Sequence, residues 1–234
     1  MHFDFNSGTI SLAEKNKKKI DAMDFATGSR IRIADLETAV ARLMYASSVL
    51  GVRLARHYYA IKFLRRKLSE LNRETATRND MVEIPPSSLT AFRQWHAEVK
   101  QSPPRKLPQL DGRKRFTLWT DASMTGWGAV LIDESTQRVH IVAGRWSAEE
   151  ALMHINVLEA RAVSLALSKF TMIDGAIIQP KIDNTSVIGS MRKGMSNSAD
   201  LSEYVAKIDD IAAARDIILL RPHYVRSEEN LADY

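Results

Sequence analysis

The chain has 234 residues, of which 45% are hydrophobic and 26% charged, so it can bury a core as one large domain or two smaller ones. It contains no cysteine, which excludes disulfides and thiolate metal sites, and it has neither a run of about 18 apolar residues nor a signal-peptide pattern. We therefore expect a soluble intracellular protein without membrane association, either cytoplasmic or nuclear. The sequence leaves its oligomeric state open.

The first half of the chain is predicted to be mainly helical. Apolar residues at helical spacing or a capping pattern mark four candidate helices, over residues 11–24, 34–50, 53–71 and 87–100. Ser11 followed by Glu14 forms the capping pattern of the first helix. Pro103, Pro104 and Pro108 follow the last helix and predict a linker.

The chain is predicted to consist of three parts. We expect a helical, thumb-like connection region over residues 1–85, a linker with a short helix over 86–112, and a compact domain over 113–234.

Residues 1–115 carry 22 Lys and Arg against 12 Asp and Glu, whereas residues 116–234 carry 11 against 16. A basic region attracts a phosphate backbone, and an acidic one is typical of an enzyme that binds divalent cations. A role in solubility alone is the competing interpretation.

The predicted helix over residues 53–71 is both amphipathic and basic. Its apolar residues form one stripe, and Arg65, Arg66 and Lys67 lie mostly off it. Two interpretations stay open. These side chains either contact the phosphates of a nucleic acid, or they form a solvated face over a core stripe.

The second half alternates between strand and helix patterns. Strands are predicted over residues 115–121, 127–133, 137–146, 176–182 and 216–221, and helices near 149–170, 185–193 and 200–214. Three hairpin-joined strands followed by helix and strand units imply an α/β fold. Its sheet should be mixed, with five strands and helices on its faces.

Four acidic residues stand at the ends or faces of these apolar elements. Asp121 and Asp183 each end a predicted strand, Glu159 lies on the inward side of the long helix, and Asp233 follows the last strand. A carboxylate beside a sheet core is costly unless a cation, backbone donors or a metal ion offsets its charge. Four converging acids favour two Mg²⁺ or Mn²⁺ ions, which prefer oxygen ligands. A single aspartate at such a place more often caps a helix, as Asp183 could.

The order of these acids carries a resemblance to a known family. The segments WTDASMTGWGAVL, INVLEARAVSLAL, IDNTSV and HYVRSEENLADY together resemble the ribonuclease H domain of retroelement reverse transcriptases, in form closest to the gypsy-like and DIRS/VIPER-like groups. The resemblance implies a ribonuclease H-like sheet. It also implies that Asp121, Glu159, Asp183 and Asp233 bind two catalytic Mg²⁺ (or Mn²⁺) ions. The helices of the first half more diffusely resemble the connection region that joins polymerase to ribonuclease H in such enzymes.

The resemblance further implies roles for polar residues near the acids. His223 matches a mobile histidine that assists proton transfer or product release, ten residues before Asp233. Four asparagine and serine side chains are candidates for contact with the substrate: Ser123, Asn156, Asn184 and Asn230. His154 and Asn156 lie in the family's helix-entry stretch before Glu159, where a capping role is favoured over contact with the substrate.

The leading hypothesis is a metal-dependent endonuclease that cleaves the RNA strand of an RNA–DNA hybrid, with the basic first half holding the duplex. Through the resemblance, the chain corresponds to a reverse transcriptase without its polymerase palm and fingers, so the polymerase part is a candidate partner beside the hybrid. The alternative is a domesticated, non-cleaving scaffold of the same fold that binds RNA or protein. An integrase or resolvase fits less well, because those enzymes do not share the final His and Asn-x-x-Asp arrangement.

Overall fold

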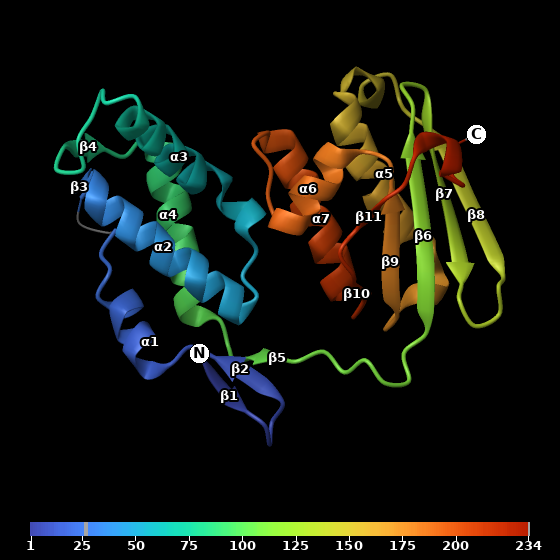
Figure 1. Cartoon of the computed structure of the whole chain (residues 1–234), viewed down its shortest axis with the longest axis horizontal. Helices are drawn as coiled ribbons and strands as arrows, with labels where there is room; N and C mark the ends of the chain where they lie inside the picture. Colours follow the sequence, from blue (N-terminus) through green and yellow to red (C-terminus); the bar gives the residue numbers. More distant parts are fainter. Residues whose placement is uncertain (26–27, 234) are drawn as a thin grey trace. The chain divides into compact units, whose positions relative to one another are not determined.

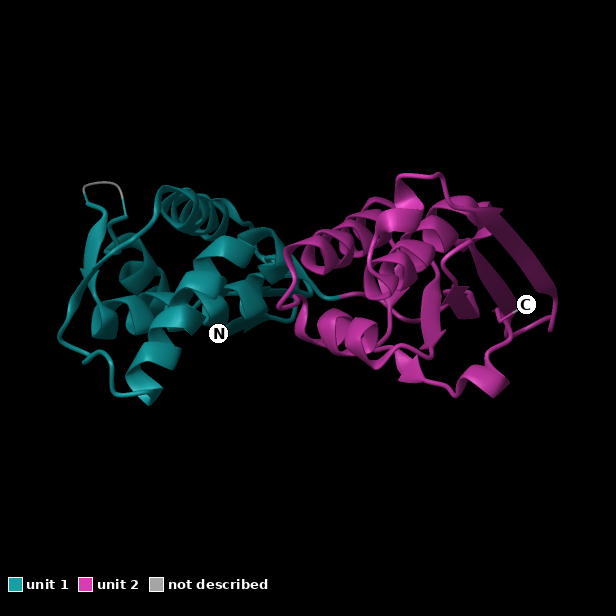
Figure 2. Ribbon diagram, turned by 90° about the horizontal axis from the view of Figure 1, so that it is seen from above, with its two compact units in different colours: residues 1–107 teal, residues 108–234 magenta. Residues whose placement is uncertain are grey.

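The computed structural model describes residues 1–25 and 28–233 (Figure 1). The chain divides into two compact units, Met1–Leu107 and Pro108–Tyr234, called unit 1 and unit 2 below (Figure 2). No helix within the described ranges is long and apolar enough to cross a membrane.

Unit 1 is built mainly from helices. They are α1 (Glu14–Asp21), α2 (Ile33–Leu50), α3 (Tyr58–Asn72), α4 (Pro86–Gln101) and a 3₁₀ turn, η1 (Leu54–His57). Its short strands are β1 (His2–Asp4), β2 (Thr9–Ser11), β3 (Arg30–Arg32), β4 (Met81–Glu83) and β5 (Arg105–Lys106), which pair antiparallel in the orders β1-β2-β5 and β3-β4. Helices α2, α3 and α4 pack around a core that includes Leu36, Leu43 and Phe92, all fully buried. Gly51 ends α2 in the left-handed conformation (φ 79°), which glycine adopts without strain.

Two features of unit 1 differ from the sequence prediction. Ser11 does not cap a helix, because it pairs with His2 across β1 and β2, and α1 begins at Glu14 with Ala13 as its N-cap. The sequence predicts a linker with a short helix over residues 86–112, whereas α4 is a sixteen-residue core helix of unit 1. Its Phe92, Trp95 and Val99 are spaced to lie on one face, and Trp95 Nε1 donates to Ser47 Oγ of α2 (2.7 Å).

Unit 2 combines one mixed β-sheet with α-helices and short 3₁₀ turns. Its strands are β6 (Arg115–Ala122), β7 (Gly126–Asp133), β8 (Val139–Arg145), β9 (Ile177–Ile182), β10 (Ile218–Leu219) and β11 (His223–Tyr224). Its helices are α5 (Ile155–Lys169), α6 (Thr185–Lys193) and α7 (Ala199–Ala214), with 3₁₀ turns η2 (Glu150–Leu152), η3 (Thr171–Ile173) and η4 (Ser227–Glu229). The strand order is β10-β9-β6-β7-β8, in which β6, β7 and β8 form antiparallel hairpins and β9 is parallel to β6.

The strand predicted over residues 216–221 forms as two short pieces. Both β10 and β11 run parallel to β9, with Ile218 beside Ile177 and His223 beside Lys181, so together they occupy the fifth position of the sheet. Pro222 lies between them and has no N–H to donate to the ladder, which accounts for the interruption. The predicted five-stranded mixed sheet is therefore confirmed, with its last strand broken in two.

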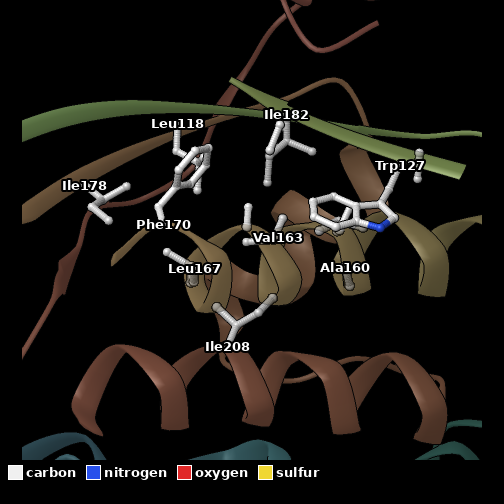
Figure 3. Packing of buried hydrophobic residues seen from close by; sticks show 14 of the residues in the cluster. Leu118, Trp127, Ala160, Val163, Leu167, Phe170, Ile178, Ile182 and Ile208 are labelled. Atoms are coloured by element: carbon white, nitrogen blue, oxygen red, sulfur yellow. The ribbon is translucent and has the colours of Figure 1, made fainter. Parts of the chain in front are cut away.

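The core of unit 2 lies between the sheet and α5. Figure 3 shows Leu118 of β6, Trp127 of β7 and Ile178 of β9 facing Val163 and its neighbours on α5. On its other side α5 packs against α7, whose Ile208 is buried. Because α5 is covered on both faces, a polar side chain on its sheet-facing side is held away from water.

Candidate metal centre

Three of the predicted acids converge at one edge of the sheet of unit 2. Asp121 is the last residue but one of β6, Asp183 directly follows β9, and Glu159 projects from α5. Each contributes a carboxylate oxygen, and these three oxygens all lie within 4.8 Å of one another. The convergence follows from topology, because β6 and β9 are adjacent and parallel, so their carboxyl ends meet at the same edge.

The three carboxylates, called the acid triad below, are partly removed from water. Glu159 is buried, with only 5% of its surface exposed, and Asp121 and Asp183 are half-buried. Burial raises the pKa of Glu159 to about 9, and the charges of Asp121 and Asp183 add to the rise. Burial, followed by the charges of Asp183 and Asp233, raises the pKa of Asp121 to about 6. At neutral pH the triad therefore keeps a proton unless a cation compensates its charge.

The described residues around the triad do not supply such a cation themselves. Within residues 1–25 and 28–233, no salt bridge reaches any of the three carboxylates. The backbone N–H of Ala122 lowers the pKa of Asp121 and Glu159, but it is the smallest of the causes that act on each group. Glu159 Oε2 and Asp183 Oδ1 are buried, and no described residue donates to them. Free carboxylate oxygens in a cluster of this size fit a divalent cation that takes oxygen ligands.

Asp183 is available to the triad because the next residue, Asn184, caps helix α6. Asn184 is the N-cap of α6, and its Oδ1 accepts from the amides of Ser186 and Val187 at 3.0 and 3.1 Å. The alternative role for Asp183, a helix cap, is thereby excluded.

Asp233 lies near the triad but is not one of the three converging acids. It is exposed, and its backbone N–H donates to Asn230 O (3.1 Å). Its charge is nonetheless close enough to raise the pKa of Asp121. Among the described residues, the group within 4.8 Å contains Asp121, Glu159 and Asp183 without Asp233.

The segment that carries Asp233 is attached to the first two strands. Asn230 is buried, and its Nδ2 donates to Thr120 O (3.0 Å) while its Oδ1 accepts from Ala232 N (3.2 Å). Both ends of the Asn230 side chain are bonded within the protein, and these bonds hold this segment. The predicted contact of Asn230 with the substrate stays a prediction. Gly128 of β7 allows the close approach, since a Cβ there would lie 2.8 Å from Ala232 O.

The other polar candidates are hydrogen-bonded within the protein. Ser123 Oγ accepts from the amides of Thr125 and Gly126, both at 3.2 Å, in the turn between β6 and β7. Asn184 Nδ2 donates to Asn156 Oδ1 (2.9 Å), which joins the first turn of α5 to the start of α6. The predicted cap of α5 is supplied by His154, whose Nδ1 accepts from Asn156 N (3.2 Å).

Unit 2 also contains the predicted His223 and a groove that Asp121 and Asp233 help to line. His223 lies in β11 beside Lys181 of β9, and its side chain is exposed. The groove has a volume of about 760 Å³. Its lining runs from the triad along β7 and β8 and includes Asp121, Asp233, Trp127, Arg145 and Ser147.

The basic candidates belong to unit 1. Arg65 and Arg66 are exposed on α3, and Lys67 pairs with Glu70 one turn away, with an N–O distance of 2.8 Å. The apolar stripe of α3 buries Tyr58 and Ile61 in the core of unit 1.

One contact at the centre was not predicted from the sequence. Ser227 Oγ, in η4, donates to Asp183 Oδ2 at 2.9 Å. A serine in the segment RSEEN has no local pattern that would indicate this contact, because its partner lies 44 residues earlier in the chain.

The strand order and the parallel pairing of β9 with β6 define the class of fold: unit 2 has a ribonuclease H-like fold. Two acids of its triad lie at the carboxyl ends of the first and fourth strands, and the third lies on α5. No protein-family model and no curated protein sequence matches the chain.

Solved structures similar to this chain include ribonuclease H proteins and a foamy viral protease-reverse transcriptase. Ribonuclease H1 of the archaeon Halobacterium salinarum is 16% identical, with 49% of this chain and 86% of that chain covered and a TM-score of 0.39. LC11-RNase H1, in complex with an RNA/DNA hybrid, is 20% identical over 52% of this chain and 91% of that one, with a TM-score of 0.41. The foamy viral protease-reverse transcriptase, in complex with dsDNA, is 14% identical over 92% of this chain and 42% of that one, with a TM-score of 0.35.

Proposed function

We propose that unit 2 is a divalent-metal-dependent endonuclease that cleaves the RNA strand of RNA–DNA hybrids. One observation carries this proposal above the others: the carboxylate oxygens of Asp121, Glu159 and Asp183 converge within 4.8 Å. Such a cluster is electrostatically unfavourable without a cation, and its all-oxygen donor set suits Mg²⁺ or Mn²⁺.

The acids would hold a pair of divalent ions, with the triad as the inner ligands and the exposed Asp233 completing the set. Bound there, the ions would stabilise the attacking water and the leaving oxygen of an in-line phosphodiester displacement. His223, which is exposed on β11, is the residue we propose to carry a proton to or from the reacting groups through its imidazole nitrogens. Asn156 and Asn184, which are hydrogen-bonded to each other, and Ser123, two residues after Asp121, are the candidates to orient a sugar hydroxyl.

The substrate is proposed from the chemistry of the site together with the sequence motifs. An RNA–DNA hybrid is recognised by its shape, its phosphates and the 2′-hydroxyls of its RNA strand. The groove along β7 and β8 begins at Asp121 and includes Arg145, which offers a cation to a phosphate. We place the chain with the retroelement reverse transcriptases, of gypsy-like or DIRS/VIPER-like form, with unit 1 as the connection region and the polymerase part as a partner.

A cleavage assay tests this function directly. The protein is incubated with a hybrid labelled on the RNA strand, in Mg²⁺, in Mn²⁺ and in EDTA, beside RNA and DNA duplexes of the same sequence. We expect metal-dependent loss of the RNA strand of the hybrid only. Asp183→Asn should lower the rate by more than about 100-fold, because changing outer-shell partners of a metal ligand already costs about 10–100-fold.

The matched control is Asp111→Asn, which makes the same chemical change at an exposed residue outside the centre. It should cleave at the parent rate. Full activity of Asp183→Asn would refute the assignment of the metal centre. Binding of the hybrid by the parent without cleavage in either metal would favour the non-cleaving scaffold instead.

A further inference from the structure

The two oxygens of Asp183 have different surroundings. Oδ2 accepts a hydrogen bond from Ser227 Oγ at 2.9 Å. Oδ1 is buried and has no donor among the described residues, and Asp183 is one of the three converging acids. A carboxylate rotates easily about its last bond unless one oxygen is held. The hydroxyl of Ser227 supplies that restraint.

Ser227 is itself held in place from both sides. Before it, β11 pairs with β9 and Val225 N donates to Ile182 O (3.0 Å), so the chain runs alongside the strand that ends in Asp183. After it, Ser227 O accepts from Asn230 N (3.0 Å), and the buried Asn230 is bonded to Thr120 O next to Asp121. The hydroxyl therefore has a fixed position relative to the strands that carry two of the acids.

We propose that Ser227 is a positioning residue of the metal centre. Its hydroxyl engages Asp183 Oδ2 and keeps Oδ1 turned into the acid triad, where it is available to a divalent cation. The segment from β11 to Asn230 thus does more than carry His223 and Asp233, since it also orients a ligand from a different strand. This inference rests on the proposed function insofar as it treats the triad as a metal centre.

Binding of Mn²⁺ alone, measured by titration calorimetry on the full chain without nucleic acid, tests the inference. Ser227→Ala should weaken Mn²⁺ binding by about 10-fold or more, as for the loss of other groups that orient metal ligands. Ser227→Thr keeps the hydroxyl and should restore most of the affinity. The unfolding temperature of Ser227→Ala in EDTA should stay at the parent value, because Ser227 is exposed.

The matched control is Ser135→Ala. Ser135 is also exposed, and its Oγ also donates to an aspartate, Asp133 Oδ1 (2.6 Å), but in the turn between β7 and β8. Removing this hydroxyl should leave Mn²⁺ affinity unchanged. A loss of affinity as large as that of Ser227→Ala would show that the effect is not specific to the centre and would overturn the inference.

A double-variant cycle separates positioning from a general structural role. If Ser227 acts through Asp183, Ser227→Ala should cause no further loss of Mn²⁺ affinity in an Asp183→Asn background. Additive losses would overturn the inference. So would a Ser227→Ala affinity equal to the parent's, and in that case the nuclease proposal would still stand.

The two proposals fail in different ways. If the parent binds Mn²⁺ and Ser227→Ala weakens that binding, but no hybrid is cleaved, the positioning role holds while the proposed nuclease function fails. If the parent binds no divalent ion, both fail. Cleavage rates measured across Mg²⁺ concentrations add a second readout, in which Ser227→Ala should need more Mg²⁺ to reach the same maximal rate.

Discussion

For the single residue Glu159, burial in the candidate site is unfavourable for the stability of the fold. It lies on a helix covered by the sheet on one side and by α7 on the other, and its Oε2 has no donor among the described residues. A buried ionised carboxylate without a partner is strongly unfavourable, so the group retains its proton instead. Functional sites are where such perturbed acids concentrate.

The raised pKa of Glu159 predicts how the metal-free protein responds to pH. Its pKa rises from 4.5 to about 9 on folding, so between these values the folded protein binds more protons than the unfolded chain. The free energy of unfolding should therefore fall as pH rises through this window. Glu159→Gln removes this titration, and its gain in stability over the parent should be absent near pH 4.5 and largest near pH 9.

Urea unfolding of both proteins in EDTA, from pH 5 to pH 9, measures this difference. Each pKa unit of the rise corresponds to about 1.4 kcal/mol, so the two profiles should separate clearly. Adding Mn²⁺ at pH 8 should stabilise the parent more than Glu159→Gln. Parallel pH profiles would mean that the burial of Glu159 imposes no charge penalty.

At the scale of elements, the site depends on how closely the segment after η4 crosses β7. Gly128 pairs with Asp121 in the hairpin, and Ala232 O occupies the space that a Cβ of residue 128 would need. The Asn230 to Thr120 bond fixes the same segment to β6. A glycine in a strand interior normally weakens the strand, and here its missing side chain provides the space for another backbone to approach.

Gly128→Ala tests this close approach. The added Cβ would lie 2.8 Å from Ala232 O, which is backbone and must shift. We expect a loss of about 1–3 kcal/mol of unfolding free energy, typical of overpacking, and weaker Mn²⁺ binding because Asp233 moves away from Asp121. Chemical unfolding and calorimetry measure both.

Gly189→Ala is the matched control for this change. Gly189 lies inside α6, and an added Cβ there meets nothing within 4 Å. It should raise stability by about 0.5–1 kcal/mol through helix propensity and leave Mn²⁺ affinity alone. If Gly128→Ala behaves like this control, the crossing segment does not depend on Gly128.

At the scale of the whole molecule, charge is divided between the two units. Residues 1–107 carry 19 Lys and Arg against 11 Asp and Glu, whereas residues 108–234 carry 14 against 17. The acidic unit holds the candidate metal centre, whose ions would reverse part of its charge. The basic unit is the candidate for holding the phosphate backbone.

Replacing Arg65, Arg66 and Lys67 by Gln tests whether α3 contacts that backbone. Hybrid binding by a cleavage-deficient parent, Asp183→Asn, should weaken equally for all sequences. The slope of log affinity against log salt should become shallower by about 0.9 for each phosphate that the variant no longer neutralises, the value for duplex DNA. Fluorescence anisotropy at several salt concentrations measures this slope.

A second triple variant controls for net charge. Lys15, Lys18 and Lys19 are exposed on α1 of the same unit, and their replacement by Gln removes the same three charges. It should change the salt slope less than the α3 variant does. Equal slopes in the two variants would remove α3 from the substrate-binding surface and favour the solvated-face interpretation.

The local sequence pattern predicted the bounds of most helices and strands of unit 2 to within a few residues. The helix expected over 185–193 is α6 with those bounds, and the expected strands at 115–121 and 127–133 are β6 and β7. These elements are marked by periodicity that each segment carries alone. The helix expected near 149–170 begins instead at Ile155, because η2 and a separate His154 cap precede it.

The sequence by itself determined which segments carry strand or helix patterns and where acids follow apolar segments. From these patterns it follows that the second half forms a mixed sheet with carboxylates at strand ends. Only the tertiary structure decided how those ends meet. It placed α4 in the core of unit 1, divided the last strand at Pro222, gave the capping to Asn184 rather than Asp183, and set Ser227 against Asp183. The physical reason is range: a helix or strand is specified by neighbours a few residues away, whereas the parallel pairing of β9 with β6 and β11 joins segments tens of residues apart and leaves no periodic trace in the chain.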